Sequence, residues 1–448
     1  MKKNYIMFIL IILINYKNIQ TQTFTKKIYS LPECLKIAQL QNYDLQISQA
    51  NTQSIGYELT NAFGNYLPGI DFNMGYSRTL NPEGSKTTNI NGLIIELPGQ
   101  NPNSYYMQAQ ASLMIFDGFN REGRYSNIQN KLESSIENNK FFSQSLIKKV
   151  YVEYIEVVKA YQIVKLRNED FNQAKQELEK IKSYYQAGAI PINEVYSQEA
   201  NIGLKEIEII KAENNLKLAK SRLLNTLGLS PNLDVEFDIS SIPTKISKND
   251  IEYFKKEVGN INSAIEMAFK NRSDLKSKEY QLKASEDGIT VARSSYMPKL
   301  MASGGWTWNN SQFSDFSKNA RSFISLNFSL PIFSNFNSDY LYQTAKINYM
   351  IVELENKKAI QEILVQIQNA YFNLEATEKQ IEISDRSVKS AELNYNSMKE
   401  RYNLGAANIT ELTLANNQYI VAQINQVSAY YDYLTAQKEL QFAIGILK

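Results

Sequence analysis

Two short phrases of this sequence share a pattern, although they lie far apart in the chain. They are YYQAGAIPINE at 184–194 and RYNLGAANITE at 401–411, and their glycines are 217 residues apart (405 − 188 = 217). The same spacing relates SLMIFDGFN at 112–120 to SLPIFSNFN at 329–337. Upstream of these segments the spacing becomes 230, as for Pro68 and Pro298 (298 − 68 = 230). A repeat of this length indicates two copies of one domain-sized unit rather than a solenoid.

The N-terminus has the composition of an export signal. Lys2 and Lys3 precede an apolar run that is too short to cross a bilayer. No cysteine follows the run directly, and the only one, Cys34, suits a small apolar position on a helix. No apolar run of about eighteen residues follows, so the exported chain is periplasmic, secreted or inserted in an outer membrane as strands. The predicted divisions are a signal peptide at 1–22, a first repeat at 23–230, a linker at 231–258 and a second repeat at 259–448.

Each repeat contains two segments in which apolar and polar residues alternate. In GIDFNMGYS, which begins at Gly69, Ile70 and Phe72 point one way while Asp71 and Asn73 point the other. Each run has about 9 to 11 residues, the length that a tilted strand needs to cross a bilayer. We predict strands at about 69–79 and 104–116 in the first repeat and at about 299–308 and 322–333 in the second.

The alternative interpretation of these strands is a soluble antiparallel sheet with one wet face. Aromatic residues crowd the strand ends, and both tryptophans of the chain are among them, which is typical of the girdles at membrane interfaces. The candidate membrane-interface aromatics are Tyr76, Phe116, Phe119, Trp306, Trp308, Phe333 and Phe336.

Very long helices are expected between the strands and the twin phrases. No proline or glycine interrupts a helical pattern of about 60 residues in either repeat, which corresponds to a helix on the order of 90 Å long. Val150, Tyr154 and Val157 belong to an apolar seam at heptad spacing, so these helices need long neighbours. The predicted long helices are at about 126–186 and 341–403, the returning helices at about 193–227 and 410–445, and the opening helices at 31–65 and 261–295.

The twin phrases mark the tips where the long helices turn back. Gly188 and Gly405 suit left-handed helix ends, while Asn193 and Thr410 are predicted to cap the returning helices. Acidic residues in a first turn favour the helix dipole, which is a purely structural explanation for the two glutamates. The alternative is that the exposed, duplicated tips form a docking surface or a gate. The candidate tip residues are Tyr185, Gly188, Asn193, Glu194, Tyr402, Gly405, Thr410 and Glu411.

Composition excludes several classes of function. The chain has no histidine and a net charge of +2 with acids and bases interspersed. A histidine-dependent catalytic or metal site is therefore absent, and the basic surface of a nucleic-acid binder is missing. No phosphate loop, nucleophile elbow or zinc motif is present. We expect no enzyme activity, no cofactor, no metal and no nucleic-acid partner.

The strand count predicts an oligomer. Four strands per chain cannot close a barrel, since the smallest single-chain outer-membrane barrels have eight, and unpaired strand edges cannot remain in lipid. An eight-stranded barrel is filled by side chains, so a conducting pore favours three chains and twelve strands. The predicted fold is an α+β membrane protein, a homotrimer whose barrel in outer-membrane lipid continues into a long periplasmic helical tube.

The order of helix, strand, IFDG turn at 115–118, very long helix, tip and returning helix, repeated twice, resembles the TolC family of outer-membrane efflux channels. The resemblance covers nearly the whole mature chain. It implies a passive exit duct in the outer membrane of a Gram-negative bacterium, serving a tripartite efflux or type I secretion system. It also implies that the tips dock a periplasmic adaptor, which couples the duct to an inner-membrane pump of the RND, ABC or MFS type.

Members of this family close their tube at the tips, some with rings of acidic side chains. Glu411 occupies the first acidic position here, whereas Leu414 stands where a second acid occurs in the family. The resemblance therefore implies either a single ring of glutamates or an apolar constriction at Leu414. The competing interpretation of the whole chain is a periplasmic helical-hairpin adaptor or structural protein without a barrel. The sequence does not indicate the cargo.

Overall fold

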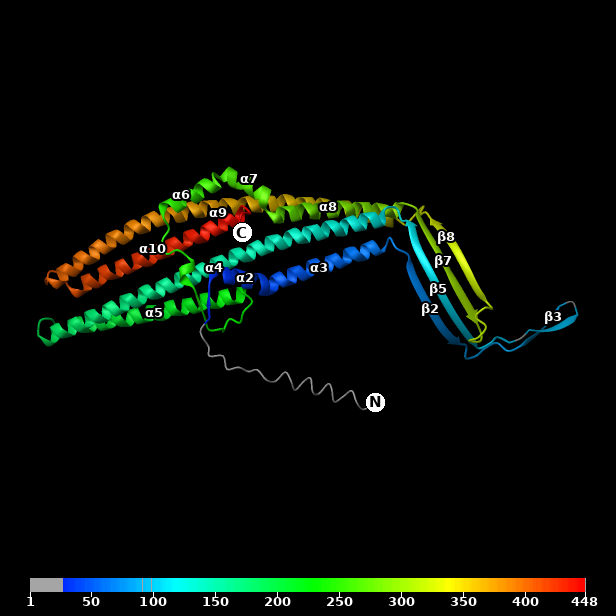
Figure 1. Cartoon of the computed structure of the whole chain (residues 1–448), viewed down its shortest axis with the longest axis horizontal. Coiled ribbons are helices and arrows are strands. Elements are labelled where there is room, and N and C mark those ends of the chain that lie inside the picture. Colours follow the sequence, from blue (N-terminus) through cyan, green and yellow to red (C-terminus); the bar gives the residue numbers. More distant parts are fainter. Residues whose placement is uncertain (1–26, 91, 98, 448) are drawn as a thin grey trace, which may run out of the picture.

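The computed structural model describes residues 27–90, 92–97 and 99–447, so the predicted signal peptide lies outside the described residues. The molecule is elongated, with a helical body at one end and a sheet at the other (Figure 1). The first repeat contains β1 (Lys27–Tyr29), α2 (Leu31–Gln41), α3 (Tyr43–Gly64), β2 (Gly69–Arg78), β3 (Lys86–Ile90), β4 (Leu93–Leu97), β5 (Asn103–Phe116), α4 (Asn120–Gln186) and α5 (Ile192–Thr226).

The linker and the second repeat follow the same plan. The linker forms β6 (Val235–Phe237), the 3-10 turn η1 (Ile239–Ser241) and α6 (Lys248–Val258). The second repeat contains α7 (Ile261–Asn271), α8 (Ser273–Arg293), the 3-10 turn η2 (Ser294–Tyr296), β7 (Lys299–Asn310), β8 (Ala320–Ser329), α9 (Asn337–Asn403) and α10 (Ile409–Ala443). Among the described residues, no helix is both long and apolar enough to cross a membrane.

Each opening helix is broken once, whereas the sequence pattern predicts a continuous helix. Asn42 separates α2 from α3 in an extended conformation, and Arg272 does the same between α7 and α8. The Asn42 side chain accepts from the N–H of Leu45 and donates to the carbonyl of Thr226, at the end of α5. Arg272 Nη1 donates to the carbonyl of Ala443, at the end of α10. The breaks therefore lie where the returning helices end against the opening helices.

The long helices begin several residues before the predicted positions. The backbone is left-handed at Phe119 (φ 69°) and Phe336 (φ 63°), immediately before each helix. Asp117 then accepts hydrogen bonds from the first N–H groups of α4, and the hydroxyl of Ser334 accepts from the backbone N–H of Ser338 in α9. These polar side chains satisfy donors that the first helical turn leaves open. Both helices have 67 residues.

The main sheet has four antiparallel strands in the order β2-β5-β7-β8. β8 ends at Ser329, earlier than expected, before Pro331, which has no N–H for strand pairing. The segment between β2 and β5, predicted to be a long polar loop, contains a hairpin of β3 and β4. Figure 1 shows β3 extending away from the end of the sheet that is farther from the helices.

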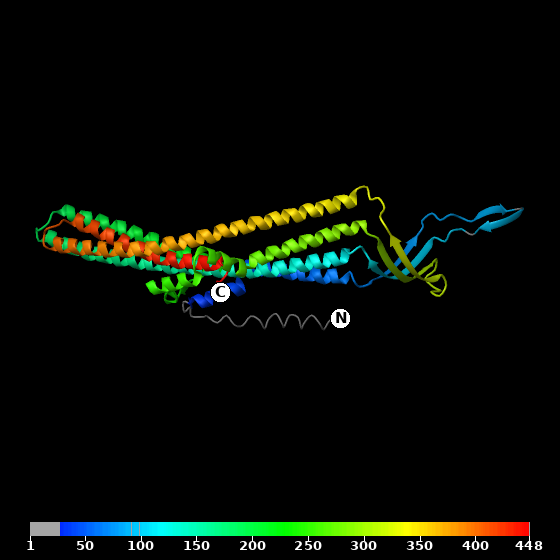
Figure 2. The same ribbon diagram turned by 90° about the horizontal axis from the view of Figure 1, so that it is seen from above.

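The helices form a single curved layer that is four elements wide. Near the sheet the order is α3-α4-α8-α9, and towards the tips it is α5-α4-α10-α9, because α4 packs against α3, α8, α5 and α10 while α9 packs against α8 and α10. β2, α3 and α5 therefore form one edge of the molecule, and β8 and α9 form the other. In Figure 2 the layer runs from the tips to the sheet, with α2 and α6 on one side of it.

A belt of short elements covers that one side of the helical layer. It consists of the parallel pair β1 and β6, with α2, α6 and α7. Tyr154 of α4 donates its hydroxyl to the carbonyl of Asp238 at 2.6 Å, and the equivalent Tyr371 of α9 donates to that of Gly259 at 3.4 Å. These equivalent tyrosines, one on each long helix, therefore anchor the belt.

Candidate functional site

The sheet has one polar and one apolar face. Residues directly opposite in antiparallel strands lie on the same face, and neighbours along a strand alternate. The observed register mostly places polar and small residues opposite one another on the polar face. One polar row is Asn73, Gln108, Thr307 and Arg321, and one apolar row is Ile70, Ala111, Gly304 and Ile324.

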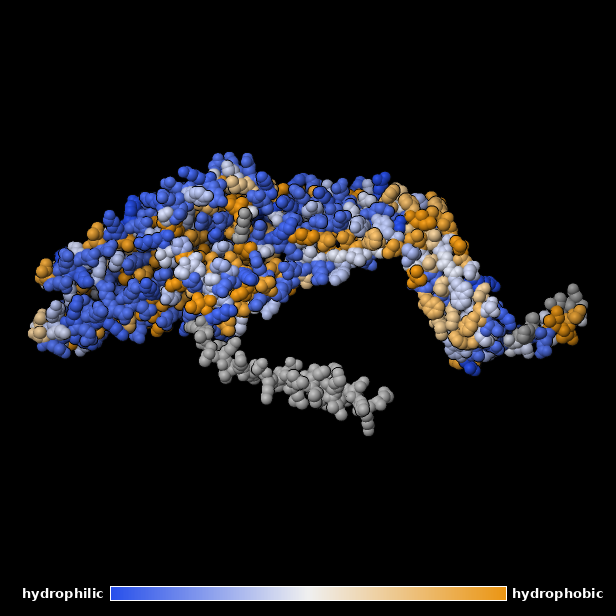
Figure 3. Space-filling model, viewed as in Figure 1, coloured by the Kyte–Doolittle hydropathy of each residue, from blue (hydrophilic) through white to orange (hydrophobic). Residues whose placement is uncertain are grey.

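Most side chains on the apolar face are uncovered in the protomer. Ile324 is 95% exposed, and Ile70, Phe72, Leu326 and Phe328 are exposed as well. Burying such residues in a hydrocarbon environment removes apolar area from water. In Figure 3 the visible side of the sheet is mostly orange and pale, whereas the helical body is mostly blue. The sheet is therefore suited to contact lipid on one face and water on the other.

The predicted interface aromatics lie at both ends of the sheet. At the end next to the helices, the rings of Phe116 and Phe119 are 5.5 Å apart and edge to face, as are those of Phe333 and Phe336 at 5.6 Å. Towards the other end, Tyr76 packs against Tyr105, with ring centroids 4.8 Å apart.

The two tryptophans lie on the apolar face of β7, in the half of the strand farther from the helices. Trp308 differs from the other aromatics because the loop after β7 covers it. Its ring packs against Phe313 and Phe316, and only 1% of the residue is exposed. Trp306 opposes Ala109 and Ser322.

The turns at the two tips have the same backbone geometry. Gly188 has φ 72° and Gly405 has φ 74°, in the left-handed region that glycine adopts at helix ends. The N–H of Ala189 donates to the carbonyl of Tyr184, and the N–H of Ala406 donates to that of Arg401. These bonds close the last turns of α4 and α9.

The prediction that Asn193 and Thr410 cap the returning helices is wrong. Each is the second residue of its helix, because α5 begins after Pro191 and α10 begins after Asn408. Asn408 Oδ1 accepts from the N–H of Glu411 at 2.9 Å, and the Glu411 carboxylate accepts from the N–H of Asn408 at 3.1 Å. This reciprocal pair is a capping box, which fixes where α10 starts.

The two tips lie side by side, and an open groove runs between them. The phenol of Tyr402, on the second tip, is partly buried near Glu177 and Glu194 of the first hairpin. Burial, followed by the two carboxylates, raises the pKa of Tyr402 to about 12. The groove is lined by Tyr184, Ala189, Ile190, Glu194, Tyr402, Asn403, Gly405, Ala406, Ala407, Asn408 and Glu411.

Glu411 and Leu414 share the exposed face of α10. Leu414 is 59% exposed, whereas the neighbouring Leu412 is buried. Residues three apart lie on one face of a helix, so the carboxylate and the leucine point in similar directions. In the first tip, Tyr185 is exposed.

An apolar cluster beneath the tips joins the two helical hairpins. Leu178 and Ile181 of α4 and Val195 of α5 pack with Ile409 and Leu412 of α10. The second hairpin therefore lies against the first over several turns.

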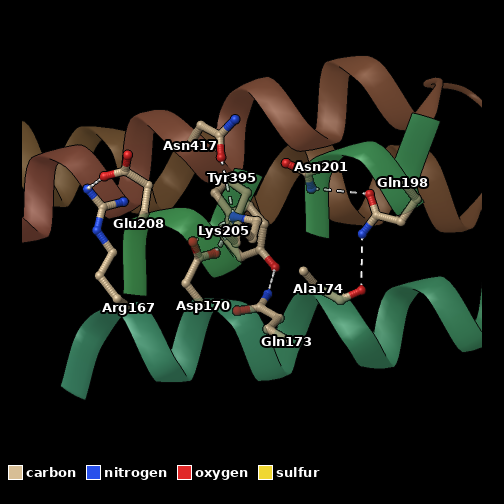
Figure 4. Close-up of polar contacts among 11 residues, drawn as sticks. Arg167, Asp170, Gln173, Ala174, Gln198, Asn201, Lys205, Glu208, Tyr395 and Asn417 are labelled. Atoms are coloured by element: carbon tan, nitrogen blue, oxygen red, sulfur yellow. Dashed lines mark hydrogen bonds and ion pairs between the residues drawn. The ribbon is translucent and has the colours of Figure 1, made fainter. Parts of the chain in front are cut away.

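A buried ion pair lies farther from the tips, within the same contact (Figure 4). Lys205 of α5 donates to both carboxylate oxygens of Asp170 in α4 at 2.6 Å, and the two side chains are only 7% and 3% exposed. From α10, Asn416 donates to Asp170 at 2.8 Å and Asn417 accepts from Lys205 at 3.4 Å. No sequence pattern identifies these residues, since isolated charges in a long helix usually face water.

The face of the helical layer opposite the belt is the candidate channel wall. Nine residues make two and a half turns of helix, so residues nine positions apart point in opposite directions. Ile163 and Gln380 lie nine positions after Tyr154 and Tyr371, so they point away from the belt that the two tyrosines contact. A groove between α4 and α5 opens beside Ile163 and is lined in part by Glu156, Lys159 and Arg222. The groove between α9 and α10 is lined by Gln380, Ile383, Ser384, Ser387, Asn425, Ser428, Ala429 and Asp432.

A family model described as "Outer membrane efflux protein" matches residues 34–229 and 264–446. These two blocks correspond to the two repeats of the chain. Within the described residues, no group of three or more acidic or cysteine side chains is arranged to hold a metal ion.

Individual relatives match at low identity over most of the chain. The outer membrane protein TolC of Salmonella enteritidis is 21% identical over 434 residues, covering 93% of this chain and 82% of the relative. TolC of Vibrio cholerae is 21% identical over 310 residues, covering 68% of each. Among solved structures, the Campylobacter jejuni CmeC outer membrane channel is similar with a TM-score of 0.75 at 20% identity, covering 93% of this chain and 85% of that one.

Proposed function

This chain belongs to the outer membrane efflux protein family, and from that membership we propose that three copies form one gated duct. As a family member, the protein lies in the Gram-negative outer membrane and acts as the exit duct of an efflux system. The duct itself supplies no energy for transport, which is driven by partners in the inner membrane.

The observation that carries the proposal is the pair of open edges on the protomer. β2, α3 and α5 lie on one edge and β8 and α9 on the other, so every level of the molecule is an arc four elements wide. An open strand edge leaves unpaired N–H and C=O groups, which lipid cannot satisfy. Joining the β2 edge of one copy to the β8 edge of the next removes all such edges when the ring closes. Three arcs give twelve strands above twelve helices.

The edge helices carry the apolar surface that such a ring would bury. Leu204 and Ile207 of α5 and Val365 and Phe372 of α9 are all exposed in the protomer. Apolar side chains spaced along one helix are typical of a seam that packs against another helix.

We place the gate at the tips, where both hairpins meet in each copy. In a trimer, three Glu411 carboxylates would form a single acidic ring, and three Leu414 side chains would lie close by as an apolar constriction. The same tips, including the exposed Tyr185 and Glu194 in the groove between them, would dock the periplasmic adaptor that connects the duct to its inner-membrane pump.

Single-channel recording of the purified oligomer in a planar bilayer tests the gate. Glu411→Gln is the sharper variant, because the amide oxygen still accepts the hydrogen bond from Asn408 while the charge is lost. We expect small cation-selective currents from the wild type and weaker cation selectivity from the variant. Glu194→Gln, in the first tip, is the matched control and is expected to change selectivity less.

Two results would argue against this account. Selectivity that does not change in Glu411→Gln would remove the acidic ring and leave Leu414 as the constriction. No current from a well-folded oligomer would favour a periplasmic bridging protein without a barrel.

A further inference from the structure

Two aromatic rings lie on the polar face of the sheet, where small and polar residues otherwise predominate. Tyr106 of β5 and Phe323 of β8 occupy equivalent positions in the two repeats, because they are separated by the repeat spacing of 217 residues (323 − 106 = 217). Each is the fourth residue of its strand, counted from the end farther from the helices. Their neighbours along the strands, Tyr105 and Ile324, lie on the apolar face.

Each ring lies over a glycine of the adjacent strand. Tyr106 is directly opposite Gly75, and Phe323 is directly opposite Gly305. A Cβ atom on Gly75 would lie 2.6 Å from Cζ of Tyr106, and one on Gly305 would lie 3.2 Å from Cε1 of Phe323. A Cβ atom fits beneath neither ring without a shift, and at Gly305 the carbonyl oxygen of Ala109, at 2.5 Å, restricts it more than the ring does. The glycines are themselves equivalent in the two repeats, so the whole glycine and ring pair is duplicated.

Covering a glycine with a ring stabilises a strand pair, which accounts for one side of each ring. It does not account for the other side. Tyr106 keeps 45% of its surface exposed, on a face that the trimer would turn towards the water-filled lumen. Phe323 is also partly exposed, so one face of each ring covers a glycine while the other stays free for contact with cargo.

We propose that these rings form an aromatic collar in the barrel lumen, which binds planar aromatic cargo by stacking. The inference rests on the proposed trimeric duct, in which the two repeats of each copy alternate around one axis. Equivalent positions then lie at the same height, and three copies bring six rings to one level near the outer mouth. Aromatic faces attract other rings, and they attract cations as well.

Block of the single-channel current provides the test. The probes are a naphthylmethyl-trimethylammonium ion and its decahydronaphthyl counterpart, which share charge and approximate size but differ in aromaticity. We expect the aromatic ion to block wild-type channels at concentrations about three- to tenfold lower, the range that corresponds to one favourable ring contact. In Tyr106→Leu/Phe323→Leu that preference disappears, while the current itself remains.

Two control variants separate ligand contact from folding. Tyr106→Phe/Phe323→Tyr retains both rings and should retain the preference. Tyr105→Leu removes a ring from the opposite, lipid-facing side and should leave the preference unchanged. A preference that persists in the double leucine variant, or is absent from conducting wild-type channels, overturns the collar. Absence of any wild-type current would instead count against the duct itself.

Discussion

Lys205 is enclosed between three helices, and its ammonium group is satisfied there by Asp170. The pair has both charges removed from water, so its attraction offsets desolvation rather than adding much stability. What the pair contributes is position, because Asn416 and Asn417 of the second hairpin bind the same two side chains. The contact therefore fixes α10 against α4 and α5 at one height.

Removing one partner of this pair should be more harmful than removing both. Lys205→Met leaves the Asp170 carboxylate buried without its cation, and we expect a loss of about 3–5 kcal/mol in the free energy of unfolding. The double variant Asp170→Leu/Lys205→Met should recover much of that loss. Denaturant unfolding of each oligomer measures both effects.

Lys211→Met is the control, since Lys211 pairs with Glu208 on the exposed surface of the same helix. Its cost should be within about 0.5 kcal/mol. Equal losses for Lys205→Met and Lys211→Met would show that burial of the pair has no energetic consequence.

At the scale of single residues, the sequence identified positions that repeat and missed those defined by a distant partner. Tyr154 was found because it follows a heptad seam, and the repeat spacing of 217 leads from it to Tyr371. Asp170 and Lys205 are not repeated, and Asn416 is 246 residues from Asp170 along the chain. No local pattern brings such residues together.

The helices and strands were predictable to the extent that they are regular. Period-two alternation identified the four strands of the main sheet, and uninterrupted helical patterns identified α4 and α9. The breaks at Asn42 and Arg272 were missed because they depend on contacts with the ends of α5 and α10. The hairpin of β3 and β4 was missed because its polar, glycine-containing segment has the composition of a loop.

At the scale of helices and strands, the junction between the ends of α5 and α2 should be sensitive to substitution. Gly228 has φ 75°, and a Cβ atom there would lie 2.8 Å from the carbonyl carbon of Gln41 at the end of α2. Gly228→Ala should destabilise the oligomer by more than the roughly 1–2 kcal/mol that a left-handed alanine costs, since the two helices must also move apart.

Gly203→Ala, in the interior of α5, provides the comparison. No atom lies within 4 Å of a Cβ at Gly203, so alanine should stabilise α5 by up to about 1 kcal/mol. Thermal unfolding of the two variants should shift in opposite directions. A shift of Gly228→Ala to higher temperature would contradict the close approach of the two helices.

The duplication also determines how whole molecules should meet. Within one copy, β5 of the first repeat pairs with β7 of the second, and Ala111 is directly opposite Gly304. By the repeat spacings of 217 and 230, Ala111 is equivalent to Phe328, and Gly304 is equivalent to Met74. The contact between copies should therefore place Phe328 of β8 opposite Met74 of β2 in the next copy. Both residues lie on the apolar face, as the lipid-facing side of a closed barrel requires.

Disulfide formation at this contact tests the trimeric duct most directly. The only native cysteine, Cys34, is buried and does not interfere. In Met74→Cys/Phe328→Cys, oxidation should link neighbouring copies into covalent dimers and trimers, because opposed residues have the short separation that a disulfide needs. Asn73→Cys/Phe328→Cys is the control, since its two thiols point to opposite faces. Covalent trimers from the first variant alone are the predicted result, and chains that remain monomeric in both variants would contradict the closed ring.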